Sequence, residues 1–132
     1  MTIVKNAQPL FAISPLDGRY SAITSPLSSC FSEYALMKKR VAVEIAYLIL
    51  LSQQQITRTF SSQEKTYLDT IITNFSLKDA ETIKKKEEKY KHDIKAIEYY
   101  LRDTLSATTL NDVIQYIHFG LTSEDVNNLS YA

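Results

Sequence analysis

Thr122 and Ser123 are the residues whose type and position best suit the binding of an anion. Gly120 lies just before them and can end a helix in the left-handed conformation, while Asp125 follows Thr122 at capping-box spacing. The start of a helix offers unpaired backbone N–H groups, so two hydroxyls placed there suit a carboxylate. The acidic side chains of Glu124 and Asp125 oppose such binding and would have to point away from it. Taken alone, the motif fits ordinary helix capping as well.

A second polar cluster, Lys91-His92-Asp93, stands just before another periodic apolar segment. It concentrates positive charge where backbone donors already face anions, and Asp93 is the expected N-cap. Taken alone, a histidine in such a place is more often a surface residue than a catalyst. His118 follows apolar residues on its own predicted helix, so we expect it to be packed or at an interface, without a catalytic role.

A third cluster begins with the turn Asp17-Gly18, which projects Arg19 and Tyr20 outward. One interpretation is a surface turn with a solvated arginine. The other is a phosphate contact, in which Arg19 presents its fork of N–H donors and Tyr20 supplies a hydroxyl or a ring face.

Together the three clusters resemble the adenylosuccinate lyases of the fumarase/aspartase superfamily. The order and separation of the segments 14–20, 91–99 and 118–125 match the amino-terminal third of that family, and the resemblance covers the chain from about Phe11 to Ala132. The most specific motifs are the Asp-Gly-Arg-Tyr, His-Asp and Thr-Ser pairs within these segments.

The resemblance implies a role for each cluster. It makes Arg19 and Tyr20 contacts to the nucleotide, His92 and Asp93 contacts to the substrate, and Thr122 and Ser123 contacts to its fumaryl part. The family has Asn, Thr or Arg where this chain has Lys91, so Lys91 contacts the substrate either by its side chain or only by its backbone. The family's base, a serine on a mobile loop, and its acid, a histidine, come from later segments, so no catalytic residue is expected here.

The activity implied by the resemblance is cleavage of adenylosuccinate to AMP and fumarate, and of the related succinyl-carboxamide ribotide, by β-elimination in purine biosynthesis. It implies no cofactor and no metal, and a homotetramer in the full-length enzyme. Other members of the superfamily, namely argininosuccinate lyase, fumarase and aspartase, remain alternatives, although the Asp-Gly-Arg-Tyr opening speaks against them. A helical interaction module without chemistry is a further alternative.

Composition limits the possible partners. The 132 residues carry 15 basic and 15 acidic side chains, so no net field favours a nucleic acid or a membrane surface. The apolar run Val41–Leu51 is far shorter than the roughly twenty residues that span a bilayer, and Met1–Gln8 does not resemble a signal peptide. The single cysteine, Cys30, is expected to be buried and cannot form an internal disulfide. We therefore expect a cytoplasmic protein.

Helical spacing of apolar residues predicts an all-α, compact helical bundle of the kind that forms the amino-terminal domain of these lyases. All three prolines and one of the two glycines lie before residue 27, which predicts an irregular stretch of about 25 residues. We expect a substrate-contacting arm at 1–26, a helical domain at 27–121 and the beginning of a central-bundle helix at 122–132. The expected helix starts are the pairs Ser61/Glu64, Ser76/Asp79 and Thr109/Asp112, together with Asp93 and Thr122.

Overall fold

The computed structural model describes residues 9–132, and the chain divides into two units, with the boundary in the sequence between Ala35 and Leu36. The first unit consists of short helical turns, because its prolines, glycine and serines favour turns over a long helix. These turns are η1 (Pro9–Phe11), α1 (Ser21–Thr24), η2 (Ser25–Leu27) and α2 (Ser28–Phe31). Cys30 is exposed here, so the prediction that it is buried is wrong.

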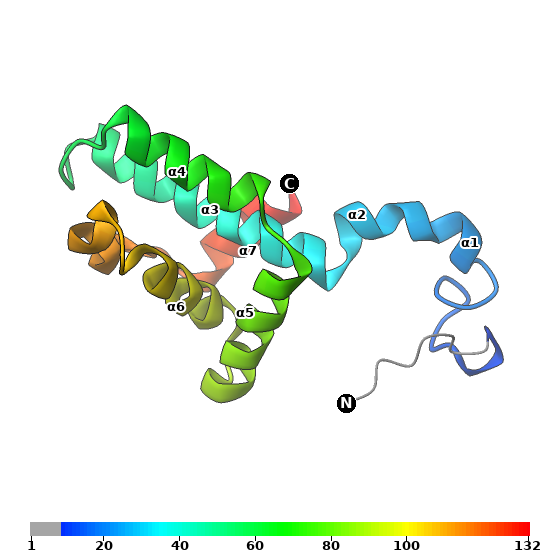
Figure 1. Cartoon of the computed structure of the whole chain (residues 1–132). Coiled ribbons are helices and arrows are strands. Elements are labelled where there is room, and N and C mark those ends of the chain that lie inside the picture. The colour runs from blue at the N-terminus through cyan, green and yellow to red at the C-terminus, as the bar shows by residue number, and fades with distance from the viewer. Residues whose placement is uncertain (1–8) are drawn as a thin grey trace. The chain divides into compact units, whose positions relative to one another are not determined.

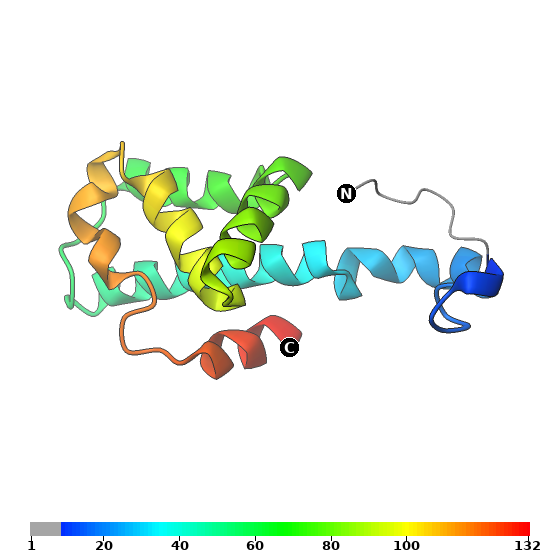
Figure 2. The same cartoon turned by 90° about the horizontal axis from the view of Figure 1, so that it is seen from below.

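The second unit is a bundle of longer helices (Figure 1). Its elements are α3 (Glu33–Gln53, which begins at the end of the first unit), α4 (Ser62–Thr73), α5 (Leu77–Tyr90), α6 (Asp93–Leu105), η3 (Thr109–Tyr116) and α7 (Ser123–Tyr131). No strand occurs in residues 9–132, and the all-α prediction is confirmed. In Figure 2, α3 lies between α7 on one side and α4 on the other.

The core of the second unit comes from the apolar stripes that the sequence predicts. A hydrogen bond also links two of its helices, since the Tyr100 hydroxyl of α6 donates to the Asp79 carboxylate of α5 at 3.0 Å. The apolar residues exposed by 1% or less are Val41, Ile45, Leu48, Leu68, Ile83, Ile94, Ala96, Ile97, Leu101, Leu105, Leu110 and Val126. These residues span α3, α4, α5, α6, η3 and α7, so each element contributes to one shared core.

Ser61, Ser76 and Thr122 are the N-caps of α4, α5 and α7, so these three predicted helix starts are confirmed. At α4, Ser61 accepts from the backbone N–H of Glu64, whose carboxylate accepts from Ser61 in return. Thr122 and Asp125 make the same reciprocal bonds at α7. These interactions satisfy N–H groups that the first turn of a helix leaves unpaired.

Two predicted helix starts are wrong by one residue. His92, not Asp93, caps α6, and Asp93 is instead drawn into an ion pair with Arg40. Thr108, not Thr109, caps η3 by accepting from the N–H of Leu110. The Thr109 hydroxyl is used elsewhere, as a donor to Glu64. Partners that are distant in the sequence therefore bind the two side chains that local spacing predicts as helix caps.

The described residues contain no helix that is both long enough and apolar enough to cross a membrane.

Candidate functional site

At the start of α7, the Asp125 side chain lies over the helix terminus, whereas binding of an anion would require it to point away. The Asp125 Oδ2 atom accepts from the Thr122 backbone N–H at 2.7 Å and from its hydroxyl at 2.8 Å. These two bonds lower the pKa of Asp125, so the group is a carboxylate at neutral pH. The Thr122 hydroxyl is thus engaged, whereas the Ser123 hydroxyl makes no hydrogen bond to any described residue and is available to a ligand.

The turn before α7 is anchored to α3. His118 and Gly120 both adopt positive φ, at 63° and 73°. The His118 Nδ1 atom bonds to the buried Glu44 carboxylate, and the Tyr47 hydroxyl donates to the carbonyl of Phe119 at 2.9 Å. Gly120 is left-handed as predicted, but it lies within this turn, beyond the end of η3 at Tyr116. His118 has a buried structural partner, in agreement with the prediction that it is packed.

The start of α6 presents His92 in a defined orientation. Its Nδ1 atom accepts from the backbone N–H of Lys95 at 3.2 Å, which leaves the proton of the neutral ring on Nε2. The His92 side chain is 50% exposed, so this Nε2–H group can donate to a ligand. Lys91 ends α5 in the left-handed conformation, with φ 54°, and is exposed. The junction thus offers an imidazole donor and an ammonium group side by side in the chain.

A depression of about 590 Å³ adjoins this junction. Burial raises the pKa of Asp93, but the Ile94 N–H group and the Arg40 guanidinium outweigh it and hold that pKa below its usual range. The depression therefore presents both signs of charge to solvent. It is lined by Lys84, Glu87, Glu88, Lys91, His92 and Asp93.

Arg40 connects the His92–Asp93 junction with α7. From α3, its Nη2 atom lies 2.7 Å from Asp93 Oδ2, and its Nε and Nη2 atoms donate to Asn127 Oδ1 at 3.1 and 2.8 Å. Arg40 was not predicted from the sequence as a site residue. The only available signal was a charged residue beside the most apolar segment of the chain.

Arg19 and Tyr20 belong to the first unit, whereas the other predicted site residues belong to the second. The turn forms as expected, because Asp17 Oδ1 accepts from the Ser14 N–H at 2.9 Å. The Arg19 guanidinium stacks over the Tyr20 ring at 4.9 Å, and both side chains are exposed. Within the second unit, Arg40 links the two helix starts that carry His92 and Ser123, and within the first unit Arg19 and Tyr20 form an accessible pair.

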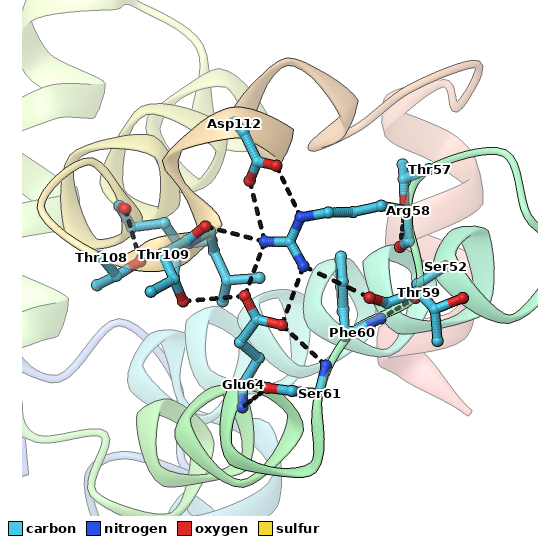
Figure 3. Close-up of polar contacts among 12 residues, drawn as sticks. Ser52, Thr57, Arg58, Thr59, Phe60, Ser61, Glu64, Thr108, Thr109 and Asp112 are labelled. Carbon is cyan, nitrogen blue, oxygen red and sulfur yellow. Dashed lines mark hydrogen bonds and ion pairs between the residues drawn. The ribbon is translucent and has the colours of Figure 1, made fainter.

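A polar network of the second unit surrounds Arg58 (Figure 3). Arg58 donates to both carboxylate oxygens of Glu64, at 3.0 and 2.7 Å, and to both of Asp112, at 2.7 and 3.0 Å. Its hydrogen bonds lower the pKa of Glu64 to about 2. The charged partners of Arg58 all lie within the second unit, so this network joins the segment before α4 to η3 and engages the guanidinium fully.

Among the described residues, no three His, Cys, Asp or Glu side chains gather in a way that could hold a metal ion.

Comparison with known proteins identifies the family. Residues 18–132 match the family described as "Lyase". The chain belongs to this lyase family. The lyase-family chain is 48% identical over 128 residues to adenylosuccinate lyase of Buchnera aphidicola subsp. Baizongia pistaciae, a match that covers 96% of this chain and 28% of that protein.

Two further relatives agree. Adenylosuccinate lyase of Haemophilus influenzae is 48% identical and that of Escherichia coli K12 is 43% identical, each over 127 residues, or 93% of this chain and 28% of the relative. The resemblance read from the three polar clusters is therefore confirmed. The lyase-family chain spans a little over a quarter of the length of these relatives.

Proposed function

We propose that this chain supplies the amino-terminal part of an adenylosuccinate lyase, which cleaves adenylosuccinate to AMP and fumarate. The related succinyl-carboxamide ribotide is the proposed second substrate. The observation that carries the proposal is the 43–48% identity to three adenylosuccinate lyases over nearly the whole chain. We further propose that the full-length enzyme is a cytoplasmic homotetramer.

The β-elimination needs a base that removes a weakly acidic proton beside a carboxylate, and donors that stabilise the resulting dianion. The base and the acid that protonates the leaving nitrogen are proposed to lie outside these residues. This chain would bind and orient the substrate. Its Ser123 hydroxyl and the N–H groups at the start of α7 would meet the fumaryl carboxylate, with Thr122 beside them.

The other junctions would hold the nucleotide. We assign Arg19 and Tyr20 to the phosphate, because an exposed guanidinium offers paired donors to phosphate oxygens. We assign the Nε2–H group of His92, together with Lys91 and Asp93, to the remainder of the substrate. Binding energy from the phosphate end would then align the scissile bond with the base and acid.

The test uses the full-length enzyme that carries this segment, assayed by ultraviolet absorbance. We expect adenylosuccinate to be cleaved, and argininosuccinate, malate and aspartate to remain unchanged. Cleavage of one of these three instead would assign the chain to another member of the superfamily, and no turnover of any substrate would favour an interaction module.

Arg19→Ala tests the phosphate contact. We expect KM to rise about tenfold or more, because a charge-assisted bidentate contact to phosphate is lost. Lys39→Ala removes the same charge from an exposed position on α3 and is the matched control. Equal effects of the two variants would contradict the assignment of Arg19.

A further inference from the structure

The Arg40 guanidinium is enclosed by the second unit. Its side chain is 9% exposed, although it leaves one of the most apolar helices of the chain. A buried positive charge needs compensating partners, since burial removes it from water. Arg40 has two of them on two different elements, Asp93 at the start of α6 and Asn127 on α7.

Each partner adjoins one of the junctions assigned to the substrate. Asp93 directly follows His92, and its second oxygen accepts from the backbone N–H of Ile94 at 2.8 Å, so both of its oxygens are used in holding this helix start. Asn127 lies one helical turn after Ser123. A single side chain therefore spans the two helix starts that carry the His92 imidazole and the Ser123 hydroxyl.

We propose that Arg40 is a positioning residue that fixes the His92 imidazole and the Ser123 hydroxyl relative to one another through Asp93 and Asn127. The two contacts of Arg40, to Asp93 and to Asn127, form a clamp, and through it Asp93 holds the start of α6 in addition to the role assigned to it above. The proposal rests on the proposed function, because it assumes that both junctions bind one substrate molecule.

The chemistry of the side chain supports this role. Guanidinium nitrogens form a rigid planar fork that serves two acceptors in fixed directions, whereas the lysine ammonium is a point charge on a flexible stem. A displacement of about 1 Å in a substrate-positioning group can cost about 100-fold in rate. Replacing Arg40 by Lys keeps the charge and removes the fork, so it isolates geometry from charge.

The experiment compares Arg40→Lys and Asn127→Ala in the full-length enzyme, with kcat and KM measured separately. We expect kcat/KM to fall about tenfold or more in each, with a larger part of the loss in kcat, because the substrate still binds but is misaligned. Arg58→Lys is the matched control. It also removes an arginine fork from the second unit, but one whose partners all lie in the Glu64–Asp112 network.

A second readout needs no activity. In nuclear magnetic resonance spectra of the 132-residue chain, Arg40→Lys and Asn127→Ala should shift the backbone amides of residues 92–94 and 122–125 together, while Arg58→Lys should shift those of residues 61–64 and 109–112. Asn127→Ala leaves Arg40 paired with Asp93, so it decides the question if Arg40→Lys fails to fold.

The outcomes separate the two proposals. A parent enzyme that does not cleave adenylosuccinate contradicts the proposed function. An active parent with unchanged kcat/KM in Asn127→Ala, or with the same loss in Arg58→Lys, contradicts the positioning role of Arg40. Loss of kcat/KM in Arg40→Lys and Asn127→Ala but not in Arg58→Lys, together with the paired amide shifts, supports the positioning role.

Discussion

Glu44 is a carboxylate whose side chain has no exposure to solvent, and His118 is its hydrogen-bonded partner. Burial raises the pKa of Glu44, and the hydrogen bond and charge of His118 oppose that rise. The second carboxylate oxygen of Glu44 has no partner among the described residues. The turn that leads into α7 is therefore held by a group that becomes costly to bury as soon as its partner is removed.

His118→Ala tests this dependence. Without the imidazole, the folded-state pKa of Glu44 should rise further above its unfolded value of about 4.5, so the variant should lose stability as the pH rises above that value. We expect the loss relative to the parent to be about 2 kcal/mol larger at pH 7.5 than at pH 5, measured by urea unfolding. The double variant Glu44→Gln/His118→Ala is the control and should abolish the difference. Parallel pH profiles of parent and His118→Ala would contradict this account.

Lys91 adopts a conformation that glycine tolerates better, with φ 54° at the end of α5. Lys91→Gly is expected to stabilise the chain by about 0.5–1 kcal/mol, seen as a higher melting temperature. Lys89→Gly, in the last turn of the same helix, should destabilise it by about 1 kcal/mol. In the full-length enzyme, a raised KM for Lys91→Gly would assign the side chain to the substrate, and an unchanged KM would leave a backbone contact. A lower melting temperature would show that no strain is stored there.

At the scale of elements, the Arg58 network joins the segment before α4 to η3 and makes their docking sensitive to acid. The pKa of Glu64 is about 2 when folded, below its ordinary value of 4.5, because Arg58 and the Ser61 N–H group stabilise the carboxylate. A lowered folded pKa contributes stability above the unfolded value, and this contribution is lost as the pH falls toward 2.

Glu64→Gln should therefore cost about 2 kcal/mol at pH 7 and progressively less between pH 5 and pH 2, since the parent loses the same ion pair on protonation. Chemical unfolding across this pH range measures the effect. Glu88→Gln, at an exposed position on α5, should leave the profile unchanged. A constant difference between Glu64→Gln and the parent at all pH values would contradict the role of the ion pair.

The sequence could predict the elements better than their first residues. Apolar periodicity predicted α3 to α6, and the pairs Ser61/Glu64, Ser76/Asp79 and Thr122/Asp125 predicted three helix starts, because those signals are local. Asp93 and Thr109 were assigned wrongly as caps, since their long-range partners Arg40 and Glu64 outweigh local spacing. No local pattern specifies such partners.

At the scale of the whole molecule, some residues of the proposed site could be predicted from sequence motifs, and others are brought to the site only by folding. Arg19, His92 and Ser123 were found through their resemblance to a family. The link between Arg40 and Asn127 joins residues 87 positions apart and has no motif, so it could not be predicted. The direction of the Asp125 side chain could not be predicted either. The sequence indicated only that this carboxylate opposes anion binding unless it points away.

We expect the 132-residue chain alone to show no measurable lyase activity. It carries proposed binding residues, while the expected base and acid belong to segments that it lacks. An ultraviolet assay with the purified chain checks this, and the full-length enzyme is the positive control. Steady cleavage of adenylosuccinate by the purified chain would place the missing groups within these residues.

The exposure of Cys30 has a practical consequence. It is the chain's single thiol, it lies in the first unit, and the sequence contains no tryptophan. A maleimide dye on Cys30 and one tryptophan introduced at Tyr131 would therefore form a clean donor–acceptor pair. Energy transfer between them would report the distance from the Arg19-bearing unit to α7, and its change when AMP is added.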